Sequence, residues 1–265
     1  MRPNTIRYLS LPTAVGSILA IVLLVLSVAP SAAAKSVGQV FIRDDVSVAH
    51  RNKLTTELRK ITGWTKLAFA DDGRLTIDSS ETRQGSSGAQ ALLSRAISGA
   101  KVIVLEDASS RSDVAFCRVV PGKWNNENSS QPPAYVILID FTDFEQIVGD
   151  KEARASFHVG WGLLHELDHV VSDTVDSESE EDLGECEVHI NAMRKEVGLP
   201  VRASYFFKAS PLKTDPNFRS RFVRLPFEQR DTASNKTKRY WLTWDAAIVG
   251  GVPNDRSASV RALVR

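Results

Sequence analysis

Cysteine is scarce in this 265-residue chain, which contains only Cys117 and Cys186. Two thiols allow one disulfide at most, so no framework of several bridges can hold the fold together. We expect a Cys117–Cys186 disulfide if the protein is exported, and two buried free thiols are the alternative. Neither cysteine lies near the N-terminal hydrophobic segment, which argues against a lipid-anchored lipoprotein.

An excess of charge of one sign is also lacking, since 33 basic residues face 32 acidic ones. This balance argues against nucleic acid as the main partner. The charge is nevertheless segregated, because residues 173–187 contain eight acids and no base, whereas the part after residue 193 is strongly basic. The two segments are either solvated surfaces or a means of capturing metal or substrate. The acidic segment lacks the D-x-D-x-D-G spacing of a calcium loop.

The first 34 residues have the layout of a targeting segment. Arg2 and Arg7 precede an apolar run over residues 14–29, which is followed by Pro30 and small residues up to Ala34. This order is typical of a secretory signal peptide cleaved after Ala34, so we expect a periplasmic, envelope-associated or secreted protein with no stable membrane insertion. The alternative is an uncleaved N-terminal helix that anchors the chain, because the run is near the lower length limit for a membrane span.

Residues 35–265 are expected to form a single domain, in which residues 35–100 either belong to the main body or form a separate lobe or propeptide. Hydrophobic periodicity predicts strands and helices mixed along the chain. The strands are predicted at 37–42, 75–77, 101–105, 114–120 and 134–141, and the helices at 50–61, 89–97, 151–172 and 182–197. No regular pattern is predicted beyond Arg202. The fold class is therefore α+β, with a sheet packed on two long helices and a metal site between them.

An HExxH pattern lies on the predicted 151–172 helix, formed by His165, Glu166 and His169. Residues four apart on a helix share one face, so both imidazoles can bind one metal ion. Glu166 then lies beside the metal, where it can take a proton from a bound water. Zinc suits this arrangement, because it binds a few nitrogen or carboxylate ligands and keeps one position open. His158 is predicted to pack or cap rather than bind metal.

A third protein ligand is needed for a tight zinc site. The chain lacks the H-E-x-x-H-x-x-G-x-x-H extension, because Val175 stands where that pattern has its third histidine. A glutamate from the following helix is therefore preferred. The apolar face of that helix places Glu187 nearer the buried boundary than Glu185. Glu187 is the predicted third ligand, and Glu185 is the alternative.

His165-Glu166-x-x-His169 with a downstream helical glutamate resembles the zincin metallopeptidases of the glutamate-ligand (gluzincin) type. The run from Asn191 to Tyr205, N-x-x-R-x-x-x-G-L-P-x-R-x-x-Y, is similar to the run after HExxH in bacterial effector-type zinc peptidases. The resemblance covers about residues 135–205. It implies a zincin-like fold and a peptide or protein substrate, whose bonds a zinc-bound water hydrolyses. The export signal and the acidic segment depart from that group, and substrate specificity does not carry over.

In the mechanism that this resemblance implies, Zn²⁺ lowers the pKa of its water and Glu166 is the general base. Tyr205, His189 and Arg202 are the candidate donors to the developing oxyanion. A catalytically silent zincin-fold protein, with structural zinc and a partner protein or envelope component as its ligand, is the alternative. A metal sensor or buffer that also uses the acidic segment is a third reading. The presence of Glu166 favours the enzyme, because a structural site has no use for a base there.

Overall fold

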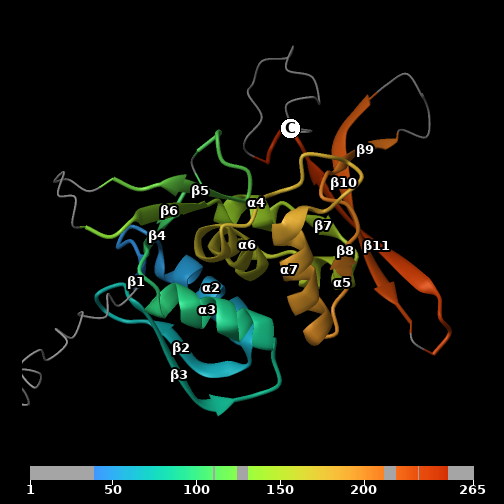
Figure 1. Cartoon of the computed structure of the whole chain (residues 1–265). Coiled ribbons are helices and arrows are strands. Elements are labelled where there is room, and N and C mark those ends of the chain that lie inside the picture. The colour runs from blue at the N-terminus through green and yellow to red at the C-terminus, as the bar shows by residue number, and fades with distance from the viewer. Residues whose placement is uncertain (1–38, 110, 124–130, 212–218, 232, 250–265) are drawn as a thin grey trace, which may run out of the picture. The chain divides into compact units, whose positions relative to one another are not determined.

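The computed structural model describes residues 39–109, 111–123, 131–211, 219–231 and 233–249 (Figure 1). The predicted signal peptide, residues 1–34, lies outside the described residues. Within the described part, no helix has the length and apolar character needed to cross a membrane.

The first sheet contains four strands in the order β1-β4-β6-β5. Strands β1 (Gln39–Ile42), β4 (Val102–Asp107) and β6 (Ala134–Ile139) are parallel, whereas β5 (Cys117–Pro121) runs antiparallel to β6 at one edge. In β1 every second residue is buried, while β6 ends in three consecutive buried residues, as expected for a strand covered on both faces. The predicted α+β class with a mixed sheet is confirmed.

Two helices of the N-terminal part share a core with the site helices. α2 (Val48–Thr62) and α3 (Ser87–Ser98) begin at Ser47 and Ser86, whose hydroxyls accept hydrogen bonds from backbone N–H groups of the first turn. Their buried apolar residues belong to one hydrophobic cluster that also contains residues from the HExxH helix and the helix after it. The hairpin of β2 (Trp64–Phe69) and β3 (Leu75–Thr82) packs beside them, and β2 was not predicted.

The helix predicted over residues 151–172 is in fact two helices, α5 (Lys151–Ala155) and α6 (Val159–Ser172). His158 is extended and its Nδ1 accepts a hydrogen bond of 3.2 Å from the Gly160 N–H, so the predicted capping role is confirmed. The break is stabilised because side chains from elsewhere bind its carbonyls: Trp161 Nε1 donates to Ala155 and Arg194 Nε donates to Ser156.

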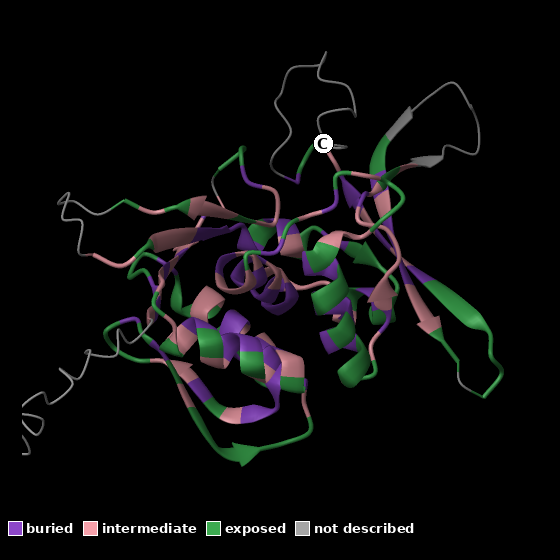
Figure 2. Cartoon of the chain, in the orientation of Figure 1, coloured by how far each residue is buried: buried purple, intermediate pink, exposed green. Residues whose placement is uncertain are grey.

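Helix α6 is the most enclosed element of this core (Figures 1 and 2). It packs against α2, α3, β5 and β6 and against α7 (Gly184–Glu196). Two glycines allow this approach. A Cβ atom at Gly160 would lie 3.0 Å from Glu57 Cβ, and one at Gly162 would lie 2.7 Å from Phe144 Cζ in α4 (Phe141–Glu145). The HExxH side chains therefore project from a helix that its neighbours hold on several sides.

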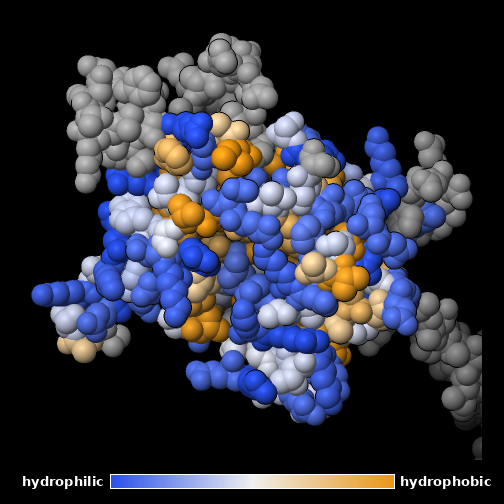
Figure 3. All heavy atoms as spheres, turned by 180° about the vertical axis from the view of Figure 1, so that it is seen from behind, coloured by the Kyte–Doolittle hydropathy of each residue, from blue (hydrophilic) through white to orange (hydrophobic). Residues whose placement is uncertain are grey.

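The chain beyond Arg202 is more regular than predicted, because it forms a second sheet in the order β7-β11-β10-β8, with β9 paired to β10. Its strands are β7 (Val148–Gly149), β8 (Val201–Arg202), β9 (Lys208–Pro211), β10 (Arg219–Arg230) and β11 (Thr237–Asp245). The inner face forms a separate hydrophobic cluster, against which Phe144 and Phe157 pack. Seen from behind, the surface is mostly hydrophilic, with hydrophobic residues in several separate groups (Figure 3).

Candidate metal centre

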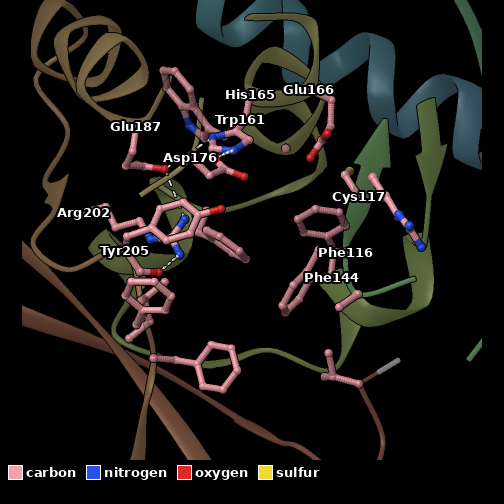
Figure 4. A pocket seen from close by; sticks show the side chains of 18 of the residues that line it. Phe116, Cys117, Phe144, Trp161, His165, Glu166, Asp176, Glu187, Arg202 and Tyr205 are labelled. Carbon is pink, nitrogen blue, oxygen red and sulfur yellow. Dashed lines mark hydrogen bonds and ion pairs between the residues drawn. The ribbon is translucent and has the colours of Figure 1, made fainter. Parts of the chain in front are cut away.

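Both histidines of the HExxH pattern turn Nε2 toward one oxygen of Asp176, and Figure 4 shows the His165 side of this arrangement. His165 Nε2 lies 3.0 Å and His169 Nε2 lies 3.3 Å from Asp176 Oδ1. Ligand atoms bound to one zinc ion at about 2.0–2.2 Å are themselves roughly 3–3.5 Å apart. The three side chains are therefore spaced as ligands of a single ion.

The Nδ1 atom of each histidine ring contacts an oxygen on the side away from Asp176. His169 Nδ1 forms a hydrogen bond of 2.8 Å with the Thr174 carbonyl, and His165 Nδ1 lies 3.5 Å from Glu187 Oε2. When a neutral imidazole donates its Nδ1–H to an oxygen, the lone pair on Nε2 is left for a metal. The tautomers and ring orientations favoured here are those of metal ligands, and the residues present fit a metal ion.

Cys186 joins His165, His169 and Asp176 in a group whose four potential ligand atoms all lie within 4.8 Å of one another. Its thiol is fully buried and donates to the His165 carbonyl at 3.3 Å. The expected Cys117–Cys186 disulfide is wrong, because both cysteines are free. The thiol of Cys186 faces the ligand group, whereas Cys117 lies on β5, where burial and then the charge of Glu166 raise the pKa of its thiol.

A network centred on Asp168 shapes the turn that leads to Asp176. The buried carboxylate of Asp168 accepts hydrogen bonds from Ser172 Oγ at 2.7 Å and from Thr174 Oγ1 at 3.0 Å. It also pairs with His189 Nδ1 at 2.9 Å. Asp168 therefore holds the end of α6 and the next turn together, and this turn leads to Asp176 and carries the Thr174 carbonyl that contacts His169.

Gly184 allows Asp176 to come close to the start of α7. The two residues form an isolated β-bridge, and Gly184 has a positive φ of 74°. A Cβ atom at this position would lie 2.3 Å from the Ser177 amide nitrogen and 2.7 Å from the Asp176 carbonyl carbon. Any larger residue would push the segment that carries Asp176 away from the histidines.

The charges of the ligand group stabilise one another. Burial opposes ionisation of Asp176, but hydrogen bonds from His165 and His169 hold its pKa well below the usual range. Burial likewise disfavours the charged form of His169, yet its contacts, first of all with Asp176, raise its pKa to about 11. The pKa of His165 is also raised, against the effect of burial, by Asp176 and further neighbours. A cation at this place would replace the protons on the two rings.

Glu187 lies on the opposite side of the His165 ring from Asp176. Its side chain is only 1% exposed, with Oε1 paired to Arg194 and Oε2 to Arg202 Nη1 at 3.1 Å. Burial opposes its charge, but the two guanidinium groups hold the pKa of Glu187 well below its usual range. Its role as a zinc ligand stays a prediction; both of its oxygens already have arginine partners. Glu185, the alternative, is exposed.

Glu166 is buried at the edge of the first sheet. Its Oε2 accepts a hydrogen bond of 2.9 Å from the Val119 N–H of β5. Burial raises the pKa of Glu166, while His165 and His169 act in the opposite direction. A carboxyl group with a raised pKa can both accept and return a proton near neutral pH, which is what a general base requires.

Of the three predicted oxyanion donors, Tyr205 faces the ligand group. Its ring stacks on that of His165 at a centroid distance of 6.3 Å, and burial and then the charge of Asp176 raise the pKa of its hydroxyl. Arg202 is engaged by Glu187 and by backbone carbonyls, and His189 is paired with Asp168. Of the three residues, Tyr205 is therefore the one whose hydroxyl can turn to donate a hydrogen bond to a bound ligand.

The ligand group opens into a cavity of about 460 Å³. His165, Glu166, Asp176 and Tyr205 line it together, although they come from α6 and from two separate loops. The sequence predicted the first two as site residues and gave Tyr205 as a candidate. Asp176 and Cys186 were not predicted as ligands. Asp176 is one of eight acids in residues 173–187. Its spacing of seven positions from His169 is the one signal in the sequence that could have identified it as a ligand.

Comparison of the chain with protein-family models, with curated proteins and with solved structures finds no match.

Proposed function

We propose that this protein is an exported, zinc-dependent metallopeptidase whose metal ligands are His165, His169 and Asp176. The observation that carries the proposal is the convergence of both Nε2 atoms on one oxygen of Asp176, in the same cavity as Glu166. Glu187 supports His165 from its Nδ1 side, as outer partners of metal-bound histidines do.

A bound zinc ion lowers the pKa of a coordinated water toward ~7 and polarises a scissile carbonyl. Glu166 accepts the proton of the attacking water and then delivers it to the leaving amine. Its burial keeps that proton from exchanging freely with solvent. Tyr205, which lines the cavity beside Asp176, donates a hydrogen bond from its hydroxyl to the developing oxyanion.

The outer edge of β5, which pairs with no further strand among the described residues, supports a peptide as the substrate. The Phe116 carbonyl accepts from Asp140 N–H and the Gly122 N–H donates to Ala134, so the even-numbered residues of β5 pair with the inner strand. Val119 therefore points its N–H away from β6, toward Glu166. An extended peptide can add to such an edge through main-chain hydrogen bonds. Its peptide bonds would then lie beside Glu166.

A closed structural metal site is the second candidate, and Cys186 is the observation that favours it. If its thiolate binds the ion together with His165, His169 and Asp176, four protein ligands leave no open position for water. The protein would then be a silent zincin-like binding protein. Cys186→Ser separates the candidates: we expect zinc and cleavage to be retained in the enzyme, and zinc to be lost from a closed site.

The main test compares zinc content and cleavage of a mixed peptide library by the mature protein and by Glu166→Gln. We expect one zinc per chain in both, and a loss of cleavage of at least about 100-fold in the variant. Glu185→Gln, an exposed change on the next helix, is the matched control and should cleave normally. A wild-type protein that holds zinc and cleaves nothing would refute the peptidase.

Export is tested by the N-terminus of the protein isolated from its own cells. We expect mass spectrometry to find a chain that begins at Lys35, because the small residues up to Ala34 form the cleavage site. A chain that retains residues 1–34 would instead support the anchored alternative.

A further inference from the structure

The cavity beside the ligand group has a second, aromatic end. This end is lined by five aromatic side chains from the residue before β5, α4, the break before α6, the residue before β9 and strand β11: Phe116, Phe144, Phe157, Phe207 and Trp244. The four phenylalanines are all partly exposed, whereas Trp244 is buried beneath them. When an apolar group fills a cavity lined by half-buried apolar side chains, more apolar surface leaves the water, and the free energy of binding becomes more favourable.

The rings of this end form a connected wall. The Phe116 ring centroid lies 5.2 Å from that of Phe144, 5.1 Å from that of Phe157 and 5.4 Å from that of Trp244. Phe207 meets Trp244 at 5.3 Å. Edge-to-face and tilted pairs of this kind keep their geometry and present ring edges and faces to a further aromatic group.

Phe116, at the centre of the wall, has a positive φ of 62°, which is unfavourable for a bulky residue. Its backbone is held in this conformation by two hydrogen bonds, from its N–H to Asp143 Oδ2 and from the Asp140 N–H to its carbonyl. It is also the residue before Cys117, the first residue of β5. The strained residue therefore joins the open strand edge directly to the aromatic end of the cavity.

We propose that the cavity selects substrates with a large apolar side chain, aromatic above all, next to the scissile bond. This inference rests on the proposed function, because it takes the occupant to be a substrate peptide held beside Glu166. The guanidinium of Arg202 lies 5.9 Å from the Phe157 ring centroid, and its charge is already paired with Glu187. Arg118 and Asp113 line the cavity as exposed residues.

The test uses peptides that differ only in one residue, Phe, Leu, Ala or Glu, beside the scissile bond. Wild-type kcat/KM is measured for each, and binding of the same peptides to zinc-loaded Glu166→Gln is followed by tryptophan fluorescence, since Trp161 and Trp244 line the cavity. We expect Phe and Leu to exceed Ala by about 10- to 100-fold in both measurements, with Glu weakest.

Two variants locate the preference. Ala246→Phe fills the cavity from its wall and should reduce the ratio of kcat/KM for the Phe peptide to that for the Ala peptide to about 1. Ile248→Ala is the matched control, because Ile248 is 57% exposed and does not line the cavity. It should keep the wild-type preference.

The outcomes separate this inference from the proposed function. Cleavage of all four peptides with equal kcat/KM would overturn the aromatic preference and leave the peptidase intact. Absence of cleavage, together with stronger binding of the Phe peptide to Glu166→Gln, would overturn the peptidase and keep the preference as a binding property.

Discussion

Two carboxylates approach His165 from opposite sides, and their surroundings differ. Asp176 meets Nε2 from a turn, its side chain is 41% exposed, and its partners are the two histidines and Tyr205. Glu187 meets Nδ1 from a helix, is 1% exposed, and is paired with Arg194 and Arg202. The first is placed to bind an ion together with the histidines. The second already has its charge neutralised.

The difference shows that proximity to an HExxH helix does not by itself identify a zinc ligand. A ligand must face the atoms that the metal would share, and it needs a charge that other cations have not already satisfied. Asp176 meets both conditions, whereas the two arginines would compete with zinc for Glu187. The predictions that follow are ordered from the largest expected effect to the smallest.

Asp176→Ala should have the largest effect on metal binding. We expect zinc affinity to fall by more than about 100-fold, because the loss of a ligand exceeds the loss of an outer partner. The metal-free protein should also lose stability, because Asp176 pairs with both histidines when no metal is bound. Calorimetric zinc titration and urea unfolding measure the two quantities. Full zinc affinity in this variant would return the third-ligand role to Glu187.

Glu187→Gln should act mainly on stability. The change leaves the buried Arg194 without its carboxylate partner, so we expect a loss of about 3–5 kcal/mol in the free energy of unfolding. Zinc affinity should fall by about 10- to 100-fold, the usual cost of removing an outer partner. The loss of stability relative to the loss of zinc affinity should therefore be larger for Glu187→Gln than for Asp176→Ala. This comparison measures the difference between the two carboxylates.

Gly184→Ala tests how the Asp176 turn is positioned. Gly198→Ala is its matched control, because both glycines have a positive φ, 74° and 72°, but a Cβ atom at Gly198 would meet nothing within 4 Å. The control should lose about 1–2 kcal/mol of stability from its backbone conformation alone and keep its zinc affinity. Gly184→Ala should lose more stability and bind zinc more weakly. Equal behaviour of the two variants would show that the close approach of Gly184 to Asp176 is unimportant.

The smallest effect is on pH dependence. The pKa of His169 is raised to about 11, so its protonation stabilises the metal-free fold fully below pH 6.5, and that stability is lost as the pH rises through about 11. Zinc must displace this proton near pH 7. Titration in buffers of different ionisation enthalpy should detect its release. Asp176→Asn should reduce the release more than Glu187→Gln, because Asp176 contacts both histidines whereas Glu187 contacts His165. Equal proton release in all three proteins would contradict the pairing of His169 with Asp176.

Local signals predicted the elements that carry the HExxH pattern. The four-residue spacing of His165 and His169 places them on one helical face wherever the helix lies, and the end of the next helix follows from Gly198 and Pro200. The break between α5 and α6 was missed because the carbonyls it leaves unpaired are bound by Trp161 and Arg194, the latter from a distant helix. The second sheet was missed for a related reason, since its strands depend on long-range pairing.

The sequence by itself determined the α+β class, the two histidines on one helical face, the glutamate beside them and the scarcity of thiols. Only the tertiary structure decided which acid faces the histidines, that the cysteines are free, and which aromatic rings line the cavity. The physical reason is that helical periodicity acts over a few residues. The position of Asp176 instead depends on contacts of Asp168 and Gly184 that form only when α6, the turn and α7 pack together.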